Sequence, residues 1–177
     1  MPPDEPRNVD PSPAATAETV TAEQFRQTMA LLPAAVNIVT SDGPGGRAGL
    51  TASAVCSVTD APPTLLVCVN ALRSTGDAFL ANKALCVNTI GPEHEDLARL
   101  FGGRTPPEER FAAGDWRTGR SGAPVLTGAL ASFDCQVDEV KTVGTHHVLF
   151  CRVLEVAALP GGQASVYFAR RFHALTP

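Results

Sequence analysis

The chain has 177 residues, enough for one domain with a hydrophobic core, and its 44% apolar and 18% charged residues exclude a disordered protein. A formal net charge of -4 argues against nucleic acid as the main partner. No apolar run approaches the roughly 18 residues of a membrane span, and the N-terminus lacks the basic start and apolar block of a secretory signal. We therefore expect a cytoplasmic protein without membrane contact.

The start of the chain separates into a tail and a helix. Residues 1–20 are rich in Pro, Ala, Asp and Glu without hydrophobic periodicity, which predicts a disordered tail before one domain over residues 21–177. Thr21 opens the stretch TAEQ, a capping box with Gln24 at N3, and Pro33 closes the helix that this box predicts.

Short apolar runs separated by turn residues predict strands along the rest of the chain. These runs lie at 36–40, 50–59, 64–70, 85–90, 129–140, 147–156 and 165–168. Two helices are expected, one over about 74–83 with Ser74 as N-cap and one from Pro92 to Gly102. Because strands outnumber helices, we predict a mainly β fold, an antiparallel barrel with a few peripheral helices.

The run LTASAVCSVT at 50–59 carries small hydroxyl side chains on one face, namely Thr51, Ser53, Ser57 and Thr59. A face packed against a polar ligand needs small side chains that donate hydrogen bonds. The alternative is an ordinary solvated strand.

The stretch GPGGRA at 43–48 has the spelling of a dinucleotide-binding loop. That loop requires a helix to follow, because the pyrophosphate sits at the helix N-terminus. An alternating strand follows here instead, so Pro44 and its glycines predict a hairpin loop.

The cysteines predict reduced, buried thiols. Their number is odd and no C-x-x-C pair occurs, so neither a disulfide framework nor a zinc site is indicated, and we expect no metal. A nucleophilic cysteine stays an alternative without support from the pattern. The cysteines are Cys56, Cys68, Cys86, Cys135 and Cys151.

Residues 23–174 contain the following characteristic stretches in this order: FRQTMALLPAAVNIVTSDGPGGRAGLTASAVCSVTDAPPTLLVCVN, LCVNTI, LARLFGG, ERF, GAPVLTGALASFDCQV, VGTHHVLFCRV and VYFARRFH. This arrangement resembles the short-chain flavin reductase family, the small NAD(P)H:flavin oxidoreductases of two-component monooxygenases, such as the reductase component of 4-hydroxyphenylacetate monooxygenase. The resemblance implies an FMN-binding split β-barrel, a homodimer, and hydride transfer from NADH to FMN, with the reduced flavin supplied to a separate monooxygenase. FAD or riboflavin in place of FMN, and a bound or a diffusing flavin, stay open.

The resemblance also implies a flavin site. The isoalloxazine edge would lie along Thr51, Ala52, Ser53 and Ala54, and the end of the next strand would border it with Cys68, Val69 and Asn70. The phosphate would be held by Arg73, Ser74 and Thr75 at the start of a helix. Leu72 and Gly76 depart from the family pattern, which has a serine and a nearby histidine there.

Two further residues resemble flavin neighbours of the family, and each has a structural alternative. Asn88 is an asparagine inside an apolar strand and could simply bind backbone. Phe101 precedes the Gly-Gly pair and could simply pack in the core. Arg73, likewise, could be a surface cation.

His146 in GTHH is the expected catalytic residue, which positions NADH and helps deliver a proton to the reduced flavin; the alternative is a turn histidine. The C-terminal segment would bind NADH through Tyr167, Arg171, Phe172 and His173, with Arg171 and His173 favoured over Arg170. The alternative there is a surface or dimer-interface segment. No further Lys/Arg cluster marks a 2′-phosphate pocket, which favours NADH over NADPH.

Two rival functions remain from the sequence. One is a split-barrel protein that binds flavin or haem without reductase activity. The other is a flavin-dependent oxidase or monooxygenase on the same fold.

Overall fold

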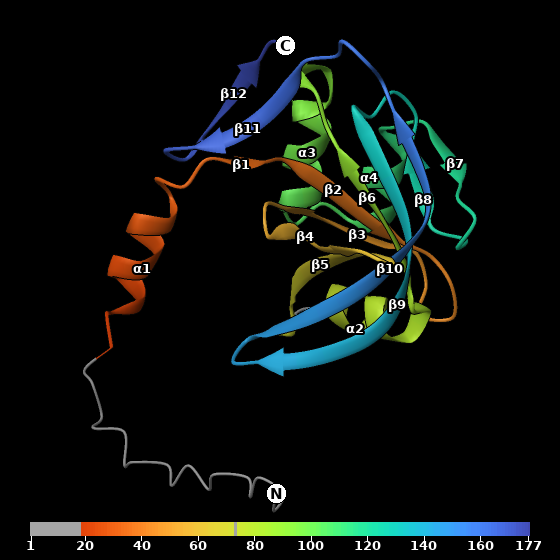
Figure 1. The fold of residues 1–177 in the computed structure, drawn as a ribbon, viewed down its shortest axis with the longest axis horizontal. Coiled ribbons are helices and arrows are strands. Elements are labelled where there is room, and N and C mark those ends of the chain that lie inside the picture. The colour runs from red at the N-terminus through yellow and green to blue at the C-terminus, as the bar shows by residue number, and fades with distance from the viewer. Residues whose placement is uncertain (1–18, 73) are drawn as a thin grey trace, which may run out of the picture.

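The computed structural model describes residues 19–72 and 74–177 (Figure 1). The expected tail over residues 1–20 therefore lies almost wholly outside the described residues, as does Arg73. The helices are α1 (Ala22–Met29), α2 (Ser74–Asn82), the 3-10 helix η1 (Pro92–His94), α3 (Glu95–Gly102) and α4 (Pro107–Ala112). The strands are β1 (Ala34–Ala35), β2 (Asn37–Ser41), β3 (Ala48–Ala52), β4 (Val55–Asp60), β5 (Pro63–Asn70), β6 (Ala84–Thr89), β7 (Trp116–Thr118), β8 (Pro124–Leu126), β9 (Ala131–Val143), β10 (His146–Ala158), β11 (Ala164–Phe168) and β12 (Arg171–Leu175).

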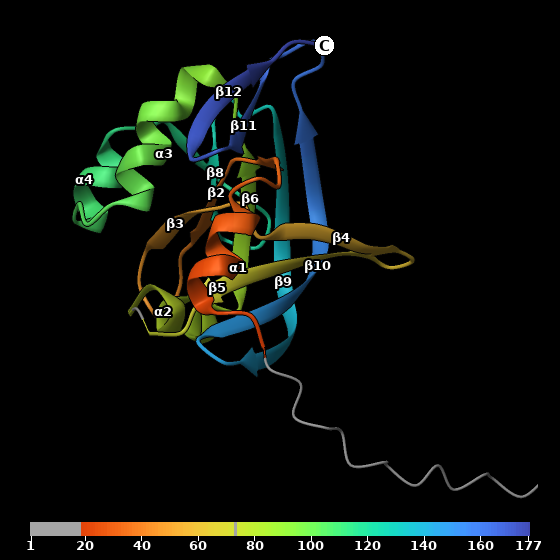
Figure 2. The same cartoon turned by 90° about the vertical axis from the view of Figure 1, so that its left-hand side faces the viewer.

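Seven of these strands form one antiparallel sheet in the order β3-β2-β6-β9-β10-β5-β4, which confirms the mainly β prediction. The sheet curls into a barrel, and β3 and β4 are its two edges. These edges are consecutive in the chain, yet they run to opposite sides of the barrel (Figure 2). Only Ser53 and Ala54 join them.

This arrangement corrects the expected single strand over 50–59. The strand ends at Ala52 and a new one starts at Val55, whose N–H donates to the Ser53 carbonyl at 3.0 Å in a tight turn. Val58, which alternates with the hydroxyl residues of this run, is 47% exposed because β4 is an edge strand that projects from the barrel. The alternation of the sequence runs through the break and does not reveal it.

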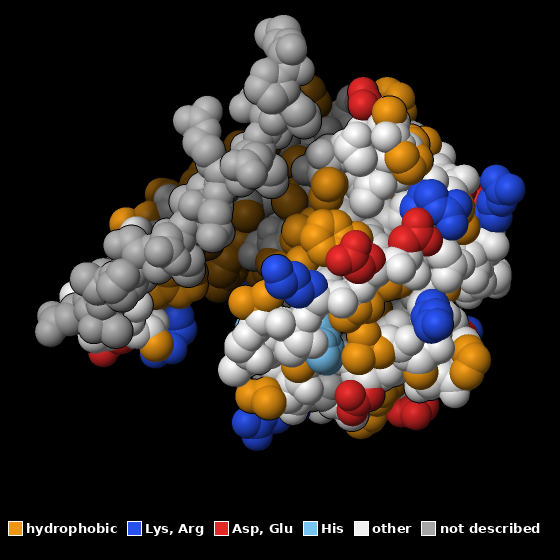
Figure 3. Space-filling view, turned by 60° about the horizontal axis from the view of Figure 1, so that its bottom comes forward, with side chains coloured by type: hydrophobic (Ala, Val, Ile, Leu, Met, Phe, Trp, Pro, Cys, Tyr) orange, Lys and Arg blue, Asp and Glu red, His pale blue; other side chains and the backbone are white. Residues whose placement is uncertain are grey.

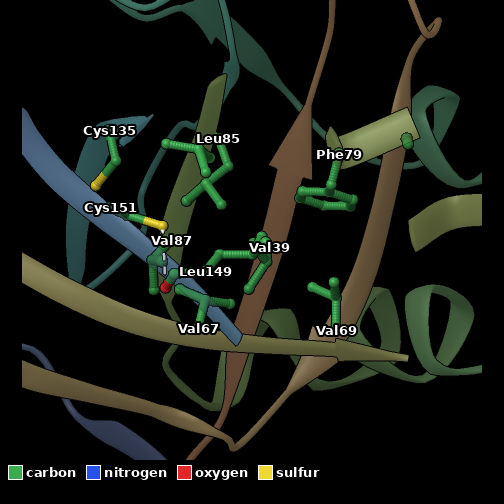
Figure 4. Close-up of a cluster of buried hydrophobic side chains, with 11 residues drawn as sticks. Val39, Val67, Val69, Phe79, Leu85, Val87, Cys135, Leu149 and Cys151 are labelled. Carbon is green, nitrogen blue, oxygen red and sulfur yellow. Dashed lines mark hydrogen bonds between the residues drawn. The ribbon is translucent and has the colours of Figure 1, made fainter. Parts of the chain in front are cut away.

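The barrel interior is filled by aliphatic side chains from alternate strand positions (Figure 4). Val39, Val67, Val87 and Leu149 are all fully buried there, and Phe79 of α2 closes one end. A second cluster lies under α3 and α4 and includes Ile38, Ile90, Leu97, Phe101 and Phe111. These two clusters thus stabilise the barrel and the helices beside β3.

The local predictions at α1 and at the 43–48 loop are confirmed. Thr21 Oγ1 accepts from Gln24 N at 3.1 Å, and Gln24 Oε1 accepts from Thr21 N at 2.9 Å, so the capping box is complete. Residues 43–48 connect the antiparallel pair β2 and β3 as a hairpin loop, and no helix follows them. The hydrophobic pattern of the sequence did not predict α4, β1, β7, β8 and β12.

The elements outside the barrel include α1 and a small sheet. No residue of α1 is buried, and the helix stands to the side of the barrel (Figure 1). β11 and β12 form a hairpin that pairs with β1. None of the helices in the described part of the chain is long and apolar enough to cross a bilayer.

Candidate active site

Three hollows meet at Ser53, in the short link between the two sheet edges. The histidine hollow, about 310 Å³, lies between β3, the end of β5 and His146. The hairpin hollow, also about 310 Å³, lies between β3, α3 and the β11–β12 turn. The α1 hollow, about 530 Å³, lies between α1, β4 and β5. Ser53 lines all three.

The histidine hollow gathers most of the expected flavin residues. Its lining comprises Leu50, Thr51, Ala52, Ser53, Ala54, Cys68, Asn70, Phe101, Gly102 and His146. The strand register explains this convergence, because His146 lies opposite Asn70 in the β10–β5 pair and Cys68 N donates to the Ala54 carbonyl at 3.0 Å. Residues from distant parts of the chain thus surround one opening.

His146 and His147 face different surroundings, as strand alternation predicts. His146 lines the histidine hollow, and its Nδ1 lies 3.0 Å from the Thr145 hydroxyl. His147 lines none of the three hollows, and its Nδ1 lies 2.9 Å from the Thr142 hydroxyl.

Asn70 connects this hollow to the start of α2. Its Oδ1 accepts from Leu72 N at 2.8 Å, which shapes the turn before the helix. A Cβ at Gly76 would lie only 2.7 Å from the Asn70 carbonyl, so glycine is required there by packing. Ser74 and Thr75 form the first turn of α2 but line none of the three hollows, and Arg73 lies outside the described residues.

The hairpin hollow holds aromatic and cationic side chains. The rings of Tyr167 and Phe172 lie 5.5 Å apart, and the Arg99 guanidinium lies 4.5 Å above the Phe172 ring. Arg170 lines both this hollow and the α1 hollow. Ala169 and Arg170 both have positive φ, 48° and 64°, and this tight turn places Arg170 at the opening.

Arg171 and His173 were favoured over Arg170 from the sequence, but neither lines a hollow. Both belong to β12, and His173 Nε2 lies 3.2 Å from the Phe168 carbonyl. The sequence does not distinguish Arg170 from Arg171. The register of the β11–β12 hairpin decides which of them lies in the turn, and here it is Arg170.

Asn88 and Val69 lie in the interior. Asn88 is fully buried: its amide donates to the Ile38 carbonyl at 3.0 Å, and its Oδ1 accepts from Leu126 N at 2.8 Å, so it joins β2, β6 and β8. Val69 is 1% exposed and points into the barrel core (Figure 4). These positions match the structural alternative for Asn88 and give Val69 a core role.

Phe101 has both a core role and a site role. It is 2% exposed, and its ring packs against Phe111 and Trp116 with centroid distances of 5.1 and 5.6 Å. It also lines the histidine hollow, and a Cβ at Gly49 would lie 2.5 Å from its Cε1. The ring therefore forms a close-packed wall against β3.

The charge around the three hollows is positive. Their described lining includes Arg26, Arg99 and Arg170 and contains no Asp or Glu. Burial, and secondarily the neighbouring Cys56, raises the pKa of the Cys68 thiol, which does not favour a nucleophilic role for this cysteine. Among the described residues, no group of three His, Cys, Asp or Glu side chains could hold a metal ion.

Comparison with known proteins assigns the family. The profile of the flavin reductase like domain matches residues 29–176. The chain belongs to the flavin reductase-like domain family. This flavin reductase-like domain is 58% identical over 164 residues to the FMN reductase (NADH) RutF of Ancylobacter novellus, covering 93% of the chain and 91% of that protein. It is also 58% identical over 154 residues to RutF of Cronobacter sakazakii, covering 87% of the chain and 93% of that protein.

Solved structures of this domain family agree with the fold. The NADH:FAD oxidoreductase SgcE6 of Streptomyces globisporus superposes with a TM-score of 0.82 at 28% identity, covering 92% of this chain and all of the other. BorF, the flavin reductase component of a bacterial two-component tryptophan halogenase, gives a TM-score of 0.82 at 27% identity, covering 89% of this chain and 99% of the other. The split-barrel fold predicted for this flavin reductase-like domain is confirmed.

Proposed function

We propose that this chain is an NADH-dependent flavin reductase that transfers hydride from NADH to FMN and supplies the reduced flavin to a separate monooxygenase. The observation that carries the proposal is the meeting of the hollows at Ser53, with His146 on one side and the Tyr167–Phe172 hairpin on the other. Relatives 58% identical are named FMN reductase (NADH).

The link between the sheet edges fits the isoalloxazine ring of FMN. Thr51, Ala52, Ser53 and Ala54 are small, so they leave room for a flat ring and present backbone groups to its polar edge. No described residue hydrogen-bonds the Ser53 hydroxyl, which leaves it for a ligand. Bound FMN supplies the hydride-accepting chemistry. The protein residues hold the two rings in contact and exclude water.

The remaining flavin contacts follow from the same placement. Cys68, Asn70 and Phe101 border the ring in the histidine hollow. We expect Ser74 and Thr75, in the first turn of α2 beyond the lining of the histidine hollow, to bind the FMN phosphate, while the role of Arg73 rests on the family resemblance alone. FAD is the second candidate flavin, because the SgcE6 structure is named an NADH:FAD oxidoreductase.

The nicotinamide side uses His146 and the hairpin. We expect His146, which lines the histidine hollow, to position the nicotinamide and to help deliver a proton to the reduced flavin. Tyr167 and Phe172 offer aromatic surface to the adenine, and Arg170 offers its charge to the pyrophosphate. Arg171 and His173 contribute less, because they line none of the hollows.

A second copy of the chain completes the enzyme as a homodimer. α1 buries none of its residues, and Phe25, Met29, Leu31 and Leu32 are 45–63% exposed. Such a cluster of large apolar side chains is typical of an interface. On the face drawn in Figure 3, Lys and Arg are interspersed with Asp and Glu, which does not favour nucleic acid. The prediction of buried thiols holds for Cys86, Cys135 and Cys151 but is wrong for Cys56, which is exposed, and Cys68 is half-buried. All five cysteines are free, which supports a cytoplasmic location.

The test is NADH oxidation by the purified protein, followed by its absorbance, with and without added FMN. Oxidation that appears only with added FMN, and saturates in both substrates, supports a reductase that releases its flavin. Oxidation without added flavin supports a tightly bound cofactor. No oxidation under either condition overturns the proposal and leaves a cofactor-binding barrel. Gel filtration with light scattering tests the homodimer separately.

A further inference from the structure

Arg110 on α4 donates hydrogen bonds to backbone carbonyls of β3 and of residues 101–105, at and after the end of α3. Its Nη1 donates to the carbonyls of Gly49 at 3.1 Å and Phe101 at 3.4 Å, and its Nη2 donates to Gly103 at 3.2 Å. Its Nε donates to the Thr105 carbonyl. The guanidinium is a planar fork with five donors, so it can hold these acceptors in one fixed arrangement.

These carbonyls border the proposed flavin site. Phe101 and Gly103 flank Gly102, which lines both the histidine hollow and the hairpin hollow. Gly49 lies in β3, two positions before Thr51, and a Cβ at this position would lie only 2.5 Å from Cε1 of Phe101. Arg110 itself lines none of the three hollows. Arg110 therefore contacts the backbone of the residues that form the site, on the side that faces away from the hollows.

The electrostatics of α3 favour this contact. The last carbonyls of a helix lack partners within the helix and carry partial negative charge. Arg110 places a cation at the carbonyls of Phe101 and Gly103, where α3 ends. Helix α3 is thereby held to β3 at its C-terminal end, while Thr51 holds it at Ala98.

We propose that Arg110 is a positioning residue of the flavin site, which fixes the Phe101–Gly103 wall against β3. This inference rests on the proposed flavin reduction. It assigns a role to the ERF stretch at 109–111, which has no contact with the hollows.

The experiment compares Arg110→Ala and Arg110→Lys with Arg117→Ala. Arg117 is a matched control because it is an arginine that pairs with Glu155 on the surface, at 2.8 Å, away from the hollows. We would measure the FMN dissociation constant by flavin fluorescence, the kinetic constants for both substrates, and unfolding in urea. Fluorescence binding is independent of turnover, so it separates this inference from the proposed function.

We expect Arg110→Ala to raise the FMN dissociation constant on the order of tenfold, about 1.4 kcal/mol, with a smaller change in the KM for NADH. Ethylguanidine, added to Arg110→Ala, should restore part of the FMN affinity, which a mere loss of folded protein would not allow. Arg110→Lys keeps the charge but not the planar guanidinium, so its FMN dissociation constant should lie between those of the wild type and Arg110→Ala. Arg117→Ala should bind FMN as the wild type does.

An FMN dissociation constant within about twofold of wild type in folded Arg110→Ala, well below the tenfold step of one lost interaction, overturns the inference. An equal weakening in Arg117→Ala overturns it too. If Arg110→Ala does not fold, Arg110→Lys decides by the same criterion. Wild-type protein that binds FMN but does not oxidise NADH refutes the proposed reductase and leaves the Arg110 comparison intact.

Discussion

The Thr51 hydroxyl donates a 2.6 Å hydrogen bond to the Ala98 carbonyl, which joins the edge strand β3 to helix α3. The hydroxyl proton is used inside the protein, so Thr51 presents its backbone and oxygen lone pairs, and not this proton, to a ligand. Of the hydroxyl residues in the 50–59 run, Thr51 therefore has a structural role, whereas the hydroxyl of Ser53 has no partner among the described residues. The other two, Ser57 and Thr59, lie on β4 outside the hollows.

We expect Thr51→Val to lower the free energy of unfolding by about 1 kcal/mol, the contribution of one hydrogen bond. FMN affinity should also fall, because α3 lines both hollows beside β3. Thr51→Ser keeps the donor and should retain both properties. Urea unfolding and FMN titration of the two variants would check this, and equal behaviour of valine and serine would contradict it.

Ser53→Val should weaken FMN binding on the order of tenfold while the free energy of unfolding changes by less than about 0.5 kcal/mol. The reason is that Ser53 is exposed and lines all three hollows. Ser57→Val is the matched control, since Ser57 is exposed on β4 outside the hollows. An unchanged FMN dissociation constant in Ser53→Val would show that the Ser53–Ala54 link does not contribute to the flavin site.

His146→Ala should raise the KM for NADH on the order of tenfold, as expected for one lost hydrogen bond to the substrate, and the KM for FMN by less. His147→Ala is the neighbouring control and should leave both constants near wild type, because His147 contacts Thr142 away from the hollows. Steady-state kinetics with each substrate varied in turn gives the comparison. A larger effect on FMN than on NADH would place His146 outside the nicotinamide site.

Arg170→Gly should raise the KM for NADH without harming the fold, because glycine accepts the positive φ of 64° at this turn. Ala169→Gly relaxes the neighbouring residue, at φ 48°, and removes no charge, so its NADH kinetics should match wild type. Arg171→Ala should have less effect than Arg170→Gly. If Arg171→Ala weakens NADH binding more, the preference drawn from the sequence is restored.

Alkaline pH should destabilise the protein through its buried thiols. Burial raises the pKa of Cys151 to about 12 and lifts the pKa values of Cys86 and Cys135 further above the ordinary range. An unfolded thiol ionises near pH 8.5. The stabilisation is therefore complete below about pH 8.5 and falls as pH rises, by on the order of 2 kcal/mol per thiol at about pH 10.

Urea unfolding at about pH 7.5 and about pH 10, on either side of the unfolded thiol pKa, would measure this loss. Cys151→Ala removes one of the three buried thiols and should make the loss smaller by roughly a third. Ser57→Ala is the control, because Ser57 is exposed and its replacement removes no thiol, so the loss should stay unchanged. If Cys151→Ala lost as much free energy of unfolding at alkaline pH as the wild type, the Cys151 thiol would ionise as easily in the folded state as in the unfolded state.

Local signals predicted much of this fold. Thr21 and Gln24 specify the start of α1 by themselves, and the glycines of 43–48 specify a hairpin because the next residues alternate. The convergence of Ser53 with His146 was reached through the family resemblance. It depends on pairing between β5 and β10, which no local pattern encodes.

Other features depend on tertiary contacts that the sequence does not display. Val69 and Cys68 are neighbours in one strand, and only the curvature of the sheet decides which of them faces the core. Arg110 was missed as a functional residue because its acceptors are backbone carbonyls, one of them 61 positions away at Gly49. Carbonyls leave no residue-type signature in a sequence.

The two-residue link between the sheet edges also limits how far apart the two edge strands can lie. Ala52 ends one edge and Val55 begins the other. Their Cα atoms can therefore lie no more than about 10 Å apart in any conformation of the barrel. The width of the opening is thus set by the chain itself. A flat ring bound at this link would contact both edge strands and restrain the barrel, so we expect the flavin-free protein to be the more flexible of the two forms.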